Sequence, residues 1–124
     1  MAQVKVYGRR DVWADRRREL SDLIQASLVS VWGLPEDKRF HRFLLLDADD
    51  FICPQRSERY LIIEIICFSG RSDAAKKALI REIYDRSGYD PQDVEITIIE
   101  MPPQNWGIRG VPADELALPY KVEV

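Results

Sequence analysis

The sequence has little of what several classes of protein require. Its 124 residues include two cysteines, Cys53 and Cys67, and one histidine, His41, so a tetrahedral zinc site lacks ligands and no disulfide framework is expected. A phosphate-binding glycine loop and a nucleophile elbow are both missing. The longest apolar run, residues 60–68, contains Glu64 and is too short to span a bilayer. We therefore expect no metal, no cofactor and no membrane contact.

The charge balance gives the protein no strong field of either sign. Lys and Arg number 18 against 21 Asp and Glu, and the net charge of -3 favours neither nucleic acid nor an anionic membrane as a partner. The run Arg16-Arg17-Arg18 is interpreted as a solvated helix face, because no other basic cluster accompanies it. Free cysteines and the lack of a signal peptide favour the reducing cytoplasm.

Apolar residues recur with the periods of strands and helices. Strands are expected at 4–7, 40–46, 60–68 and 94–99, helices at 15–32 and 72–86, and a surface connection at 47–59. Asp15 is the expected N-cap of the first helix, and Gly33 followed by Pro35 marks its end. The strand at 60–68 has apolar residues on both faces, which is typical of a strand buried on both sides. A further short strand is expected at 120–124.

The order strand, helix, glycine, proline, strand occurs twice. A single domain, 1–124, is therefore expected to contain pseudo-repeats at 2–46 and 59–100, followed by a tail at 101–124. Two βαβ units predict an α/β (α+β) fold in which two helices cover one face of a mixed sheet. A ferredoxin-like arrangement has the same order of elements, so the pattern leaves both topologies open.

Three side chains are candidates for binding an anion. Gly70 permits a sharp turn after the long strand and delivers Arg71 to the start of a helix, where an arginine is suited to clamp an anion. His41 lies within an expected strand, and Arg109 lies near Trp106 in a turn bounded by glycines. The residues alone predict a local positive site without naming its ligand.

Several short motifs occur in the order found in one known family. They are Ser-Gly-Arg-Ser-Asp at 69–73, Leu-Ile-Arg-Glu at 79–82, Ile-Thr-Ile-Ile-Glu-Met at 96–101 and Trp-Gly-Ile at 106–108. With these motifs the sequence resembles the tautomerase superfamily, whose founding members are the 4-oxalocrotonate tautomerases. Its double length and the Gly-Leu-Pro-Glu-Asp at 33–37 are more similar to the long members, such as malonate semialdehyde decarboxylase and cis-3-chloroacrylic acid dehalogenase.

The resemblance implies a tandem β-α-β repeat of the tautomerase/MIF-like fold that assembles as a homotrimer, with pockets near the subunit boundaries. It also implies proton transfer on small keto or enol carboxylic acids, or the decarboxylase or hydratase chemistry of the long members. In that family an N-terminal proline supplies the catalytic amine. Here the position is Ala2, which presents a primary amine only if Met1 is removed.

The resemblance also assigns roles residue by residue. The catalytic set is Ala2 with Arg71, the latter as the carboxylate clamp. Trp106 matches the aromatic wall of the pocket, His41 matches a further arginine of the short enzymes, and Arg109 joins the substrate-binding candidates through its place near Trp106. Three positions depart from the patterns of the tautomerases and decarboxylases: Lys38, Ser69 and Glu95.

Two functions follow from this pattern. The first is a tautomerase-like isomerase, or a lyase of the decarboxylase or hydratase type, whose activity is weak or altered because Ala2 replaces the proline. The second is a catalytically inactive trimeric binding or scaffold protein with the same fold, motivated by Ala2 and the three other departures. A ferredoxin-like regulatory domain is a third interpretation and requires a dimer with a split sheet.

Overall fold

The computed structural model describes residues 1–116, and the short strand expected at 120–124 lies outside this range. Its helices are α1 Arg10–Trp13, α2 Arg17–Trp32 and α3 Asp73–Ser87, with 3-10 turns at Ala14–Arg16, Ala48–Asp50, Pro91–Asp93, Pro103–Asn105 and Ala113–Glu115. Its strands are β1 Ala2–Arg9, β2 Phe40–Leu46, β3 Leu61–Phe68, β4 Val94–Met101, β5 Gly107–Ile108 and β6 Val111–Pro112. The four longer strands form one sheet, and β5 pairs with β6 in a separate hairpin.

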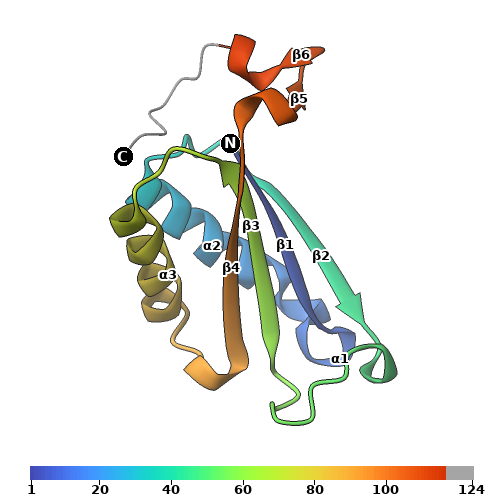
Figure 1. The fold of residues 1–124 in the computed structure, drawn as a ribbon. Coiled ribbons are helices and arrows are strands. Elements are labelled where there is room, and N and C mark those ends of the chain that lie inside the picture. Colours follow the sequence, from blue (N-terminus) through green and yellow to red (C-terminus); the bar gives the residue numbers. More distant parts are fainter. Residues whose placement is uncertain (117–124) are drawn as a thin grey trace.

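The sheet has the order β2-β1-β3-β4. The pairs β1–β2 and β3–β4 are parallel, and the two central strands, β1 and β3, are antiparallel. Figure 1 shows α2 and α3 side by side on one face of the sheet. A split βαβ unit would place another strand between β1 and β2, so the ferredoxin-like alternative is wrong. The expected mixed sheet with two helices on one face is confirmed.

The start of α2 differs from the expectation. The sequence predicts Asp15 as the N-cap, but the helix begins at Arg17 and has no side-chain cap. The chain turns earlier because the short α1 buries Trp13, which is 1% exposed. The predicted end is confirmed, since Gly33 adopts a φ of 67°, a conformation that glycine tolerates best, and α3 ends in the same way at Gly88.

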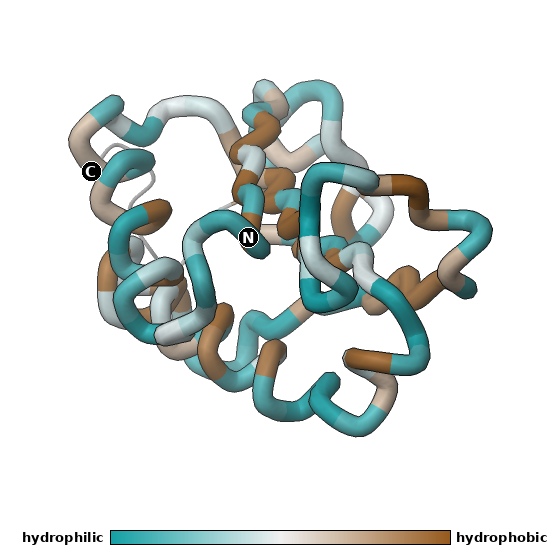
Figure 2. The backbone as a smooth tube through the Cα atoms, turned by 90° about the horizontal axis from the view of Figure 1, so that it is seen from below, coloured by the Kyte–Doolittle hydropathy of each residue, from teal (hydrophilic) through white to brown (hydrophobic). Residues whose placement is uncertain are grey.

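The core lies between the sheet and the two helices. Buried side chains from both layers meet there: Val4, Val6, Leu20, Ile24, Leu28, Ile63, Ile65, Leu79 and Ile83. Burying each such side chain contributes roughly 1.5–3 kcal/mol. Figure 2 shows hydrophobic segments along the strands and hydrophilic ones on much of the periphery. Across residues 1–116, no helix combines the length and the apolarity needed to cross a membrane.

No helix of the described chain covers the opposite face of the sheet. This open sheet face carries Gln3, Lys5, Tyr7, Phe40, Arg42, Leu44, Ile62, Glu64, Ile66, Glu95, Thr97 and Ile99. Phe40 and Leu44 are 42% and 37% exposed, and Ile62 and Ile66 are half-buried. The prediction that the long strand is buried on both sides is therefore wrong for a single chain, because its second face meets no second layer.

Candidate active site

The amino terminus is held between two strands. In β1, Ala2 lies opposite Cys67 of β3, and Gln3 lies beside Phe40 of β2. Ala2 is 2% exposed, so the first residues are fixed in the sheet rather than projecting from it. The amino group of Met1 therefore has a defined place near the end of β3 (Figure 1).

The end of β3 leads directly to an arginine. Gly70 adopts a φ of 123°, which L side chains rarely adopt, and this turn carries Arg71 to the start of α3. Arg71 is 6% exposed, and its guanidinium carbon lies 4.2 Å from the centre of the Trp32 ring. The indole N–H of Trp32 donates to the carbonyl oxygen of Ala75 at 3.0 Å. These contacts fix the guanidinium against the end of α2.

One guanidinium nitrogen of Arg71 is left without a partner. Its Nη1 atom is buried and has no hydrogen-bond acceptor among residues 1–116. A buried cationic donor without a partner is costly, so an anion that occupies this place gains both charge pairing and a hydrogen bond. The planar guanidinium fits a carboxylate especially well.

The amino group is held in its neutral form. Burial, and next the Arg71 guanidinium, lower the pKa of the Met1 amino group from 8.0 to about 5, and Lys38 adds a smaller effect in the same direction. Burial raises the pKa of the Cys67 thiol to about 11, although Arg71 opposes that shift. Near neutral pH the site therefore holds a neutral amine, a neutral thiol and a cationic guanidinium.

A buried glutamine fixes the loop that carries Lys38. The side-chain amide of Gln25 donates to the backbone carbonyl oxygens of Glu36 at 3.3 Å and Lys38 at 3.2 Å. Gln25 is 2% exposed, so water does not compete for these bonds. From the sequence, Lys38 is only a departure from a family pattern. Gln25 gives no signal at all, because a polar residue within an amphipathic helix usually faces solvent.

His41 lies between β2 and α2, beside the strand that carries the amine. Its Nδ1 atom is 2.8 Å from the hydroxyl oxygen of Ser21, and its Nε2 atom is buried without a partner among residues 1–116. Burial, and next the charge of Arg39, lower the pKa of His41 to about 4, so the ring is neutral at neutral pH. With Gln3 and Phe40 it lines a hollow of about 410 Å³. Its expected contact with substrate stays a prediction.

Trp106 and Arg109 occupy different surroundings. The Trp106 ring lies 4.7 Å from the Phe68 ring, centre to centre, and with Gln3 and Ile66 it lines a hollow of about 330 Å³. Arg109 is exposed at the turn between β5 and β6, with a φ of 51°. Figure 1 places this hairpin at the same end of the molecule as the amino terminus. Trp106 thus lines a hollow beside β1 and β3, whereas Arg109 lies at the surface, and the expected contacts of both with substrate stay predictions.

Known proteins share both the sequence and the fold of this chain. A family model described as "Tautomerase enzyme" matches residues 38–109, which is more than half of the 124 residues. This chain belongs to the tautomerase family. The expected family membership is therefore confirmed.

Individual relatives agree with this tautomerase membership. A 2-hydroxymuconate tautomerase of Pseudomonas putida is 39% identical over 57 residues, which are 43% of this chain and 90% of that protein. A malonate semialdehyde decarboxylase inhibited by 3-bromopropiolate is 27% identical, with a TM-score of 0.80 over 94% of this chain and 99% of the other. The asymmetric trimer of a fused 4-OT protein has a TM-score of 0.79 over 90% and 96% of the two chains, but at 20% identity it shows a shared fold alone.

In this chain the opposite end of the sheet is closed by an aromatic side chain. The repeat relates Leu61, at the start of β3, to Ala2, but Leu61 lies within the chain and has no free amine. A Cβ atom added to Gly8 would lie 2.9 Å from Leu61 Cδ2 and 2.9 Å from Trp13 Cδ1. The side chains of Leu61 and Trp13 therefore both pack closely against Gly8. One end of the central strand pair thus holds the amino terminus and Arg71, and the other end is filled by the side chains of Trp13 and Leu61.

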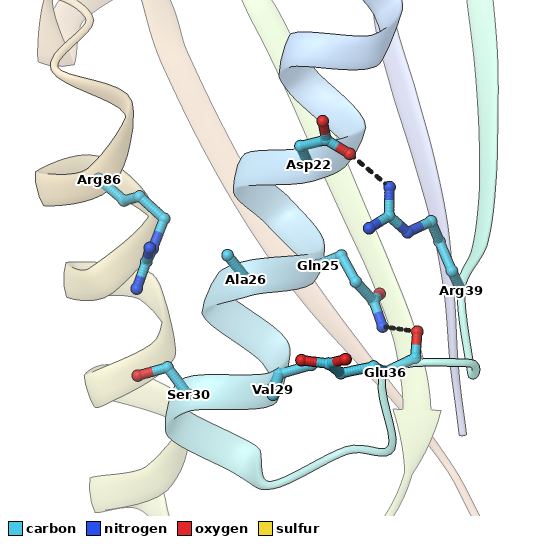
Figure 3. A pocket seen from close by; sticks show the side chains of 8 residues that line it. All are labelled: Asp22, Gln25, Ala26, Val29, Ser30, Glu36, Arg39 and Arg86. Carbon is cyan, nitrogen blue, oxygen red and sulfur yellow. Dashed lines mark hydrogen bonds and ion pairs between the residues drawn. The ribbon is translucent and has the colours of Figure 1, made fainter.

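A separate hollow lies on the outer side of the two helices. It measures about 500 Å³ and is lined by residues of α2 and α3 together with Glu36 and Arg39 (Figure 3). Its arginines are already paired, Arg39 with Asp22 at 2.6 Å and Arg86 with Glu82 at 2.7 Å. Neither Met1 nor Arg71 lines it. We therefore place the candidate active site at the amino terminus and not in this hollow.

Metal ligands are not gathered in the described part of the chain. Within residues 1–116, no group of three or more His, Cys, Asp or Glu side chains is arranged to hold a metal ion. Of the described side chains, those of Arg71, Cys67 and Lys38 act on the Met1 amino group.

Proposed function

We propose that this chain is an enzyme that transfers protons on small keto or enol carboxylic acids, with the amino terminus as base and Arg71 as carboxylate clamp. The observation that carries the proposal is the buried Arg71 guanidinium, whose Nη1 atom lacks a partner among residues 1–116 and whose charge helps to lower the pKa of the Met1 amino group. The tautomerase membership supports this reaction class. The relative from Pseudomonas putida is itself a tautomerase.

The proposed reaction is the ketonisation of an enol acid. Arg71 binds the carboxylate and so fixes the orientation of the substrate relative to the amine. The neutral amine takes the proton of the enol hydroxyl, and the oxygen lone pair forms the carbonyl as the C=C pair takes up a proton at carbon. An ammonium with a lowered pKa is a strong proton donor, so the group that removes the first proton also supplies the second.

The identity of the first residue sets the level of activity. Initiator methionine is commonly removed before a small residue, and the primary amine then belongs to Ala2, which is buried at the start of β1. Retention of Met1 displaces the amine by up to ~3.6 Å and turns the Ala2 nitrogen into an amide. We expect weaker catalysis than with an N-terminal proline, because alanine lacks the ring that fixes the direction of the amine.

The open sheet face supports a homotrimer of this chain. Phe40 and Leu44 expose apolar surface there, and Lys5 lies opposite Glu64 in the β1–β3 register. Packing this face against other copies would remove apolar area from water and give the half-buried β3 side chains a second layer. We expect light scattering to give three times the 14.4 kDa chain mass, and a Phe40→Asp variant to dissociate. A monodisperse monomer would rule the trimer out.

Both cysteines support the reducing cytoplasm as the setting. Cys53 is half-buried, Cys67 is buried, and both are free thiols. The proposed chemistry needs no cofactor, since the amine and the guanidinium supply the proton transfer and the charge.

The decisive experiment measures ketonisation of 2-hydroxymuconate by its ultraviolet absorbance, on protein whose N-terminus has been defined by mass spectrometry. We expect a rate above buffer for the form that begins at Ala2. Arg71→Gln should lower kcat/KM by about 100-fold, the order expected for losing one charge-assisted carboxylate contact. Arg81→Gln, a change at an exposed position of α3, serves as the matched control and should leave the rate unchanged. No rate above buffer for the Ala2 form would reject the proposal.

A catalytically inactive trimeric binding or scaffold protein is the second candidate. Glu95 occupies the place that the resemblance gives to an arginine in the short enzymes. Its carboxylate forms an ion pair with Arg56 at 3.4 Å, so that place carries a negative charge where the short enzymes carry a positive one. A panel of small carboxylates in a thermal-shift assay separates the cases, because a specific ligand raises Tm even without turnover. A raised Tm without ketonisation favours a binding protein, and an unchanged Tm favours a scaffold.

A further inference from the structure

We propose that the hollow on the outer side of α2 and α3 binds a small primary alkylammonium ion, with the side chains of Gln25 and Glu36 as its polar partners (Figure 3). Met1 and Arg71 do not line this hollow, so the site is separate from the candidate active site. The inference therefore does not depend on the proposed proton-transfer function. Its ligand class is a compact amine that is protonated at neutral pH.

Gln25 offers an acceptor atom that nothing in the described chain uses. Its side-chain nitrogen donates to the backbone carbonyl oxygens of Glu36 at 3.3 Å and Lys38 at 3.2 Å. These two bonds fix the orientation of the amide, because a flipped amide would place its oxygen against two carbonyl oxygens. Oε1 is therefore a buried acceptor without a donor among residues 1–116, on a side chain that is 2% exposed. A ligand that satisfies this atom must bring a hydrogen-bond donor.

The charges that line the hollow include one unpaired carboxylate. Arg39 pairs with Asp22 at 2.6 Å, and Arg86 pairs with Glu82 at 2.7 Å. Glu36 is exposed and lines the hollow, and its carboxylate forms no ion pair with any residue of the described range 1–116. A cation therefore meets an unpaired carboxylate, whereas an anion would have to take an arginine from its present partner. The hollow favours a ligand with a positive charge.

An apolar wall beside these polar groups suits a hydrocarbon stem. Ala26 and Val29 lie three residues apart on one face of α2, are half-buried and line the hollow. Figure 3 shows the Glu36 side chain reaching back toward Val29, below Gln25 in that view. An ammonium head has three N–H donors, enough for Gln25 Oε1 and a Glu36 carboxylate oxygen together. The volume of about 500 Å³ is that of a site for a small organic molecule.

A ligand in this hollow acts on the loop that Gln25 holds. When Oε1 accepts a hydrogen bond from a cation, the amide becomes more polarised and its N–H groups become stronger donors. The bonds to the carbonyl oxygens of Glu36 and Lys38 then tighten. Lys38 is one of the charges that act on the Met1 amino group, so this loop connects the hollow to the amino terminus. Arg39, the next residue, lines both this hollow and the one of about 410 Å³ beside β2.

The test titrates the full-length protein with n-butylammonium chloride at constant pH and ionic strength and follows the amide groups by proton–nitrogen NMR. We expect saturable shifts of the Gln25 side-chain amide. The backbone amides of Asp37 and Arg39 should shift with it, because their peptide groups contain the carbonyls that Gln25 binds. Tetramethylammonium carries the charge without an N–H, and butanol carries the stem without a charge. Each should bind at least ~5-fold more weakly than n-butylammonium, the effect of losing one charge-assisted contact at an exposed site.

Two substitutions in the same loop separate a specific contact from the general field of the loop. Glu36→Gln removes the carboxylate and keeps the backbone carbonyl that accepts from Gln25, and it should lower the affinity for n-butylammonium by about 5-fold. Asp37→Asn is the matched control, because Asp37 is an exposed neighbour of the same charge that does not line the hollow. This control should lower the affinity by less than ~2-fold. Gln25 itself needs no substitution, since its own amide resonances report the contact in the wild-type protein.

Three results would overturn the inference. Equal affinities for n-butylammonium and tetramethylammonium would show that binding follows charge alone. Equal losses of affinity in Glu36→Gln and Asp37→Asn would show that the hollow makes no specific contact. Linear, unsaturated shifts, or saturable shifts that leave the Gln25 amide unchanged, would show that the amine does not occupy this hollow. Each of these results leaves the proton-transfer proposal untouched, because ketonisation is assayed at the amino terminus.

Discussion

The Arg71 guanidinium lies 4.2 Å from the centre of the Trp32 ring, and this contact joins the turn just before α3 to the last residue of α2. The candidate site is thus built by both halves of the chain. The Trp32 N–H in turn bonds to the Ala75 carbonyl at 3.0 Å, so the aromatic face beneath the guanidinium is itself held in place. The orientation of the clamp depends on the packing of α2 against α3.

Two replacements of Trp32 should distinguish its contribution to the stability of the fold from its contribution to the position of Arg71. Trp32→Leu removes the aromatic face and the N–H, and we expect it to lower the free energy of unfolding by about 2–4 kcal/mol and to raise KM, because Arg71 loses its support. Trp32→Phe keeps a face and loses only the hydrogen bond, at a cost of about 1 kcal/mol. Urea denaturation and ketonisation kinetics measure the two effects. Equal KM values for both variants would show that the ring does not position Arg71.

The apparent pKa of the acid limb of the kcat/KM profile should lie below the usual pKa of an amino terminus. The amine must be neutral to act. Burial and the Arg71 charge, which lower the pKa of the Met1 amino group, should act in the same direction on the amine of Ala2, so kcat/KM should rise with pH and level off above an apparent pKa below 8.0. In Arg71→Gln one of the charges that disfavours the ammonium is gone, and the limb should move upward towards the ordinary value of 8.0. A wild-type limb near 8 would mean that the amine is exposed to solvent in the working protein.

Stability should increase with pH on the acid side of neutrality. Folding lowers the pKa of His41 from 6.5 to about 4, so in that range the unfolded chain binds a proton that the folded chain does not. The free energy of unfolding should therefore rise between about pH 4 and 6.5, by on the order of 1–2 kcal/mol after allowance for solvent screening. His41→Asn, whose amide oxygen can take the place of Nδ1 near Ser21, should flatten this slope. An unchanged slope would assign the effect to other groups.

A single methyl group should test the closed end of the sheet. Gly8→Ala places a Cβ atom 2.9 Å from both Leu61 and Trp13, and we expect it to lower the free energy of unfolding by about 1–3 kcal/mol. Gly107→Ala is the matched control, because no heavy atom lies within 4 Å of the added Cβ, and it should change stability little. Denaturation midpoints for the two variants give the comparison. Equal midpoints would show that Trp13 moves aside at little cost.

Local patterns in the sequence are enough to predict the main helices and strands and the position of Arg71 between β3 and α3. Gly70 and Arg71 lie next to each other between a strand and a helix, so chain order alone predicts where the arginine lies. The open sheet face and the proximity of Lys38 to the amine could not be read in this way. Both depend on the register of strands far apart in the chain and on a loop held by the buried Gln25.

The early turn before α2 was missed for a similar reason. The run Arg16-Arg17-Arg18 predicts a solvated helix face. That pattern gives no indication that Trp13, just before it in the chain, is buried. The Arg16 guanidinium lies 4.7 Å from the centre of the Trp13 ring, so a charged residue covers an aromatic one instead of only facing water. Sequence patterns that sort residues by polarity alone cannot register such a pair.

Because the Trp13 side chain fills the far end of the sheet, substitutions at the two ends of the β1–β3 pair should have different effects. We expect substitutions around Leu61 and Gly8 to change stability, as in Gly8→Ala, without touching the amine at the other end of β1. The start of β1 has no such latitude, since every change there alters chemistry and architecture together. In the proposed trimer, each chain would contribute one end of the sheet that holds the amine and Arg71 and one end that Trp13 fills.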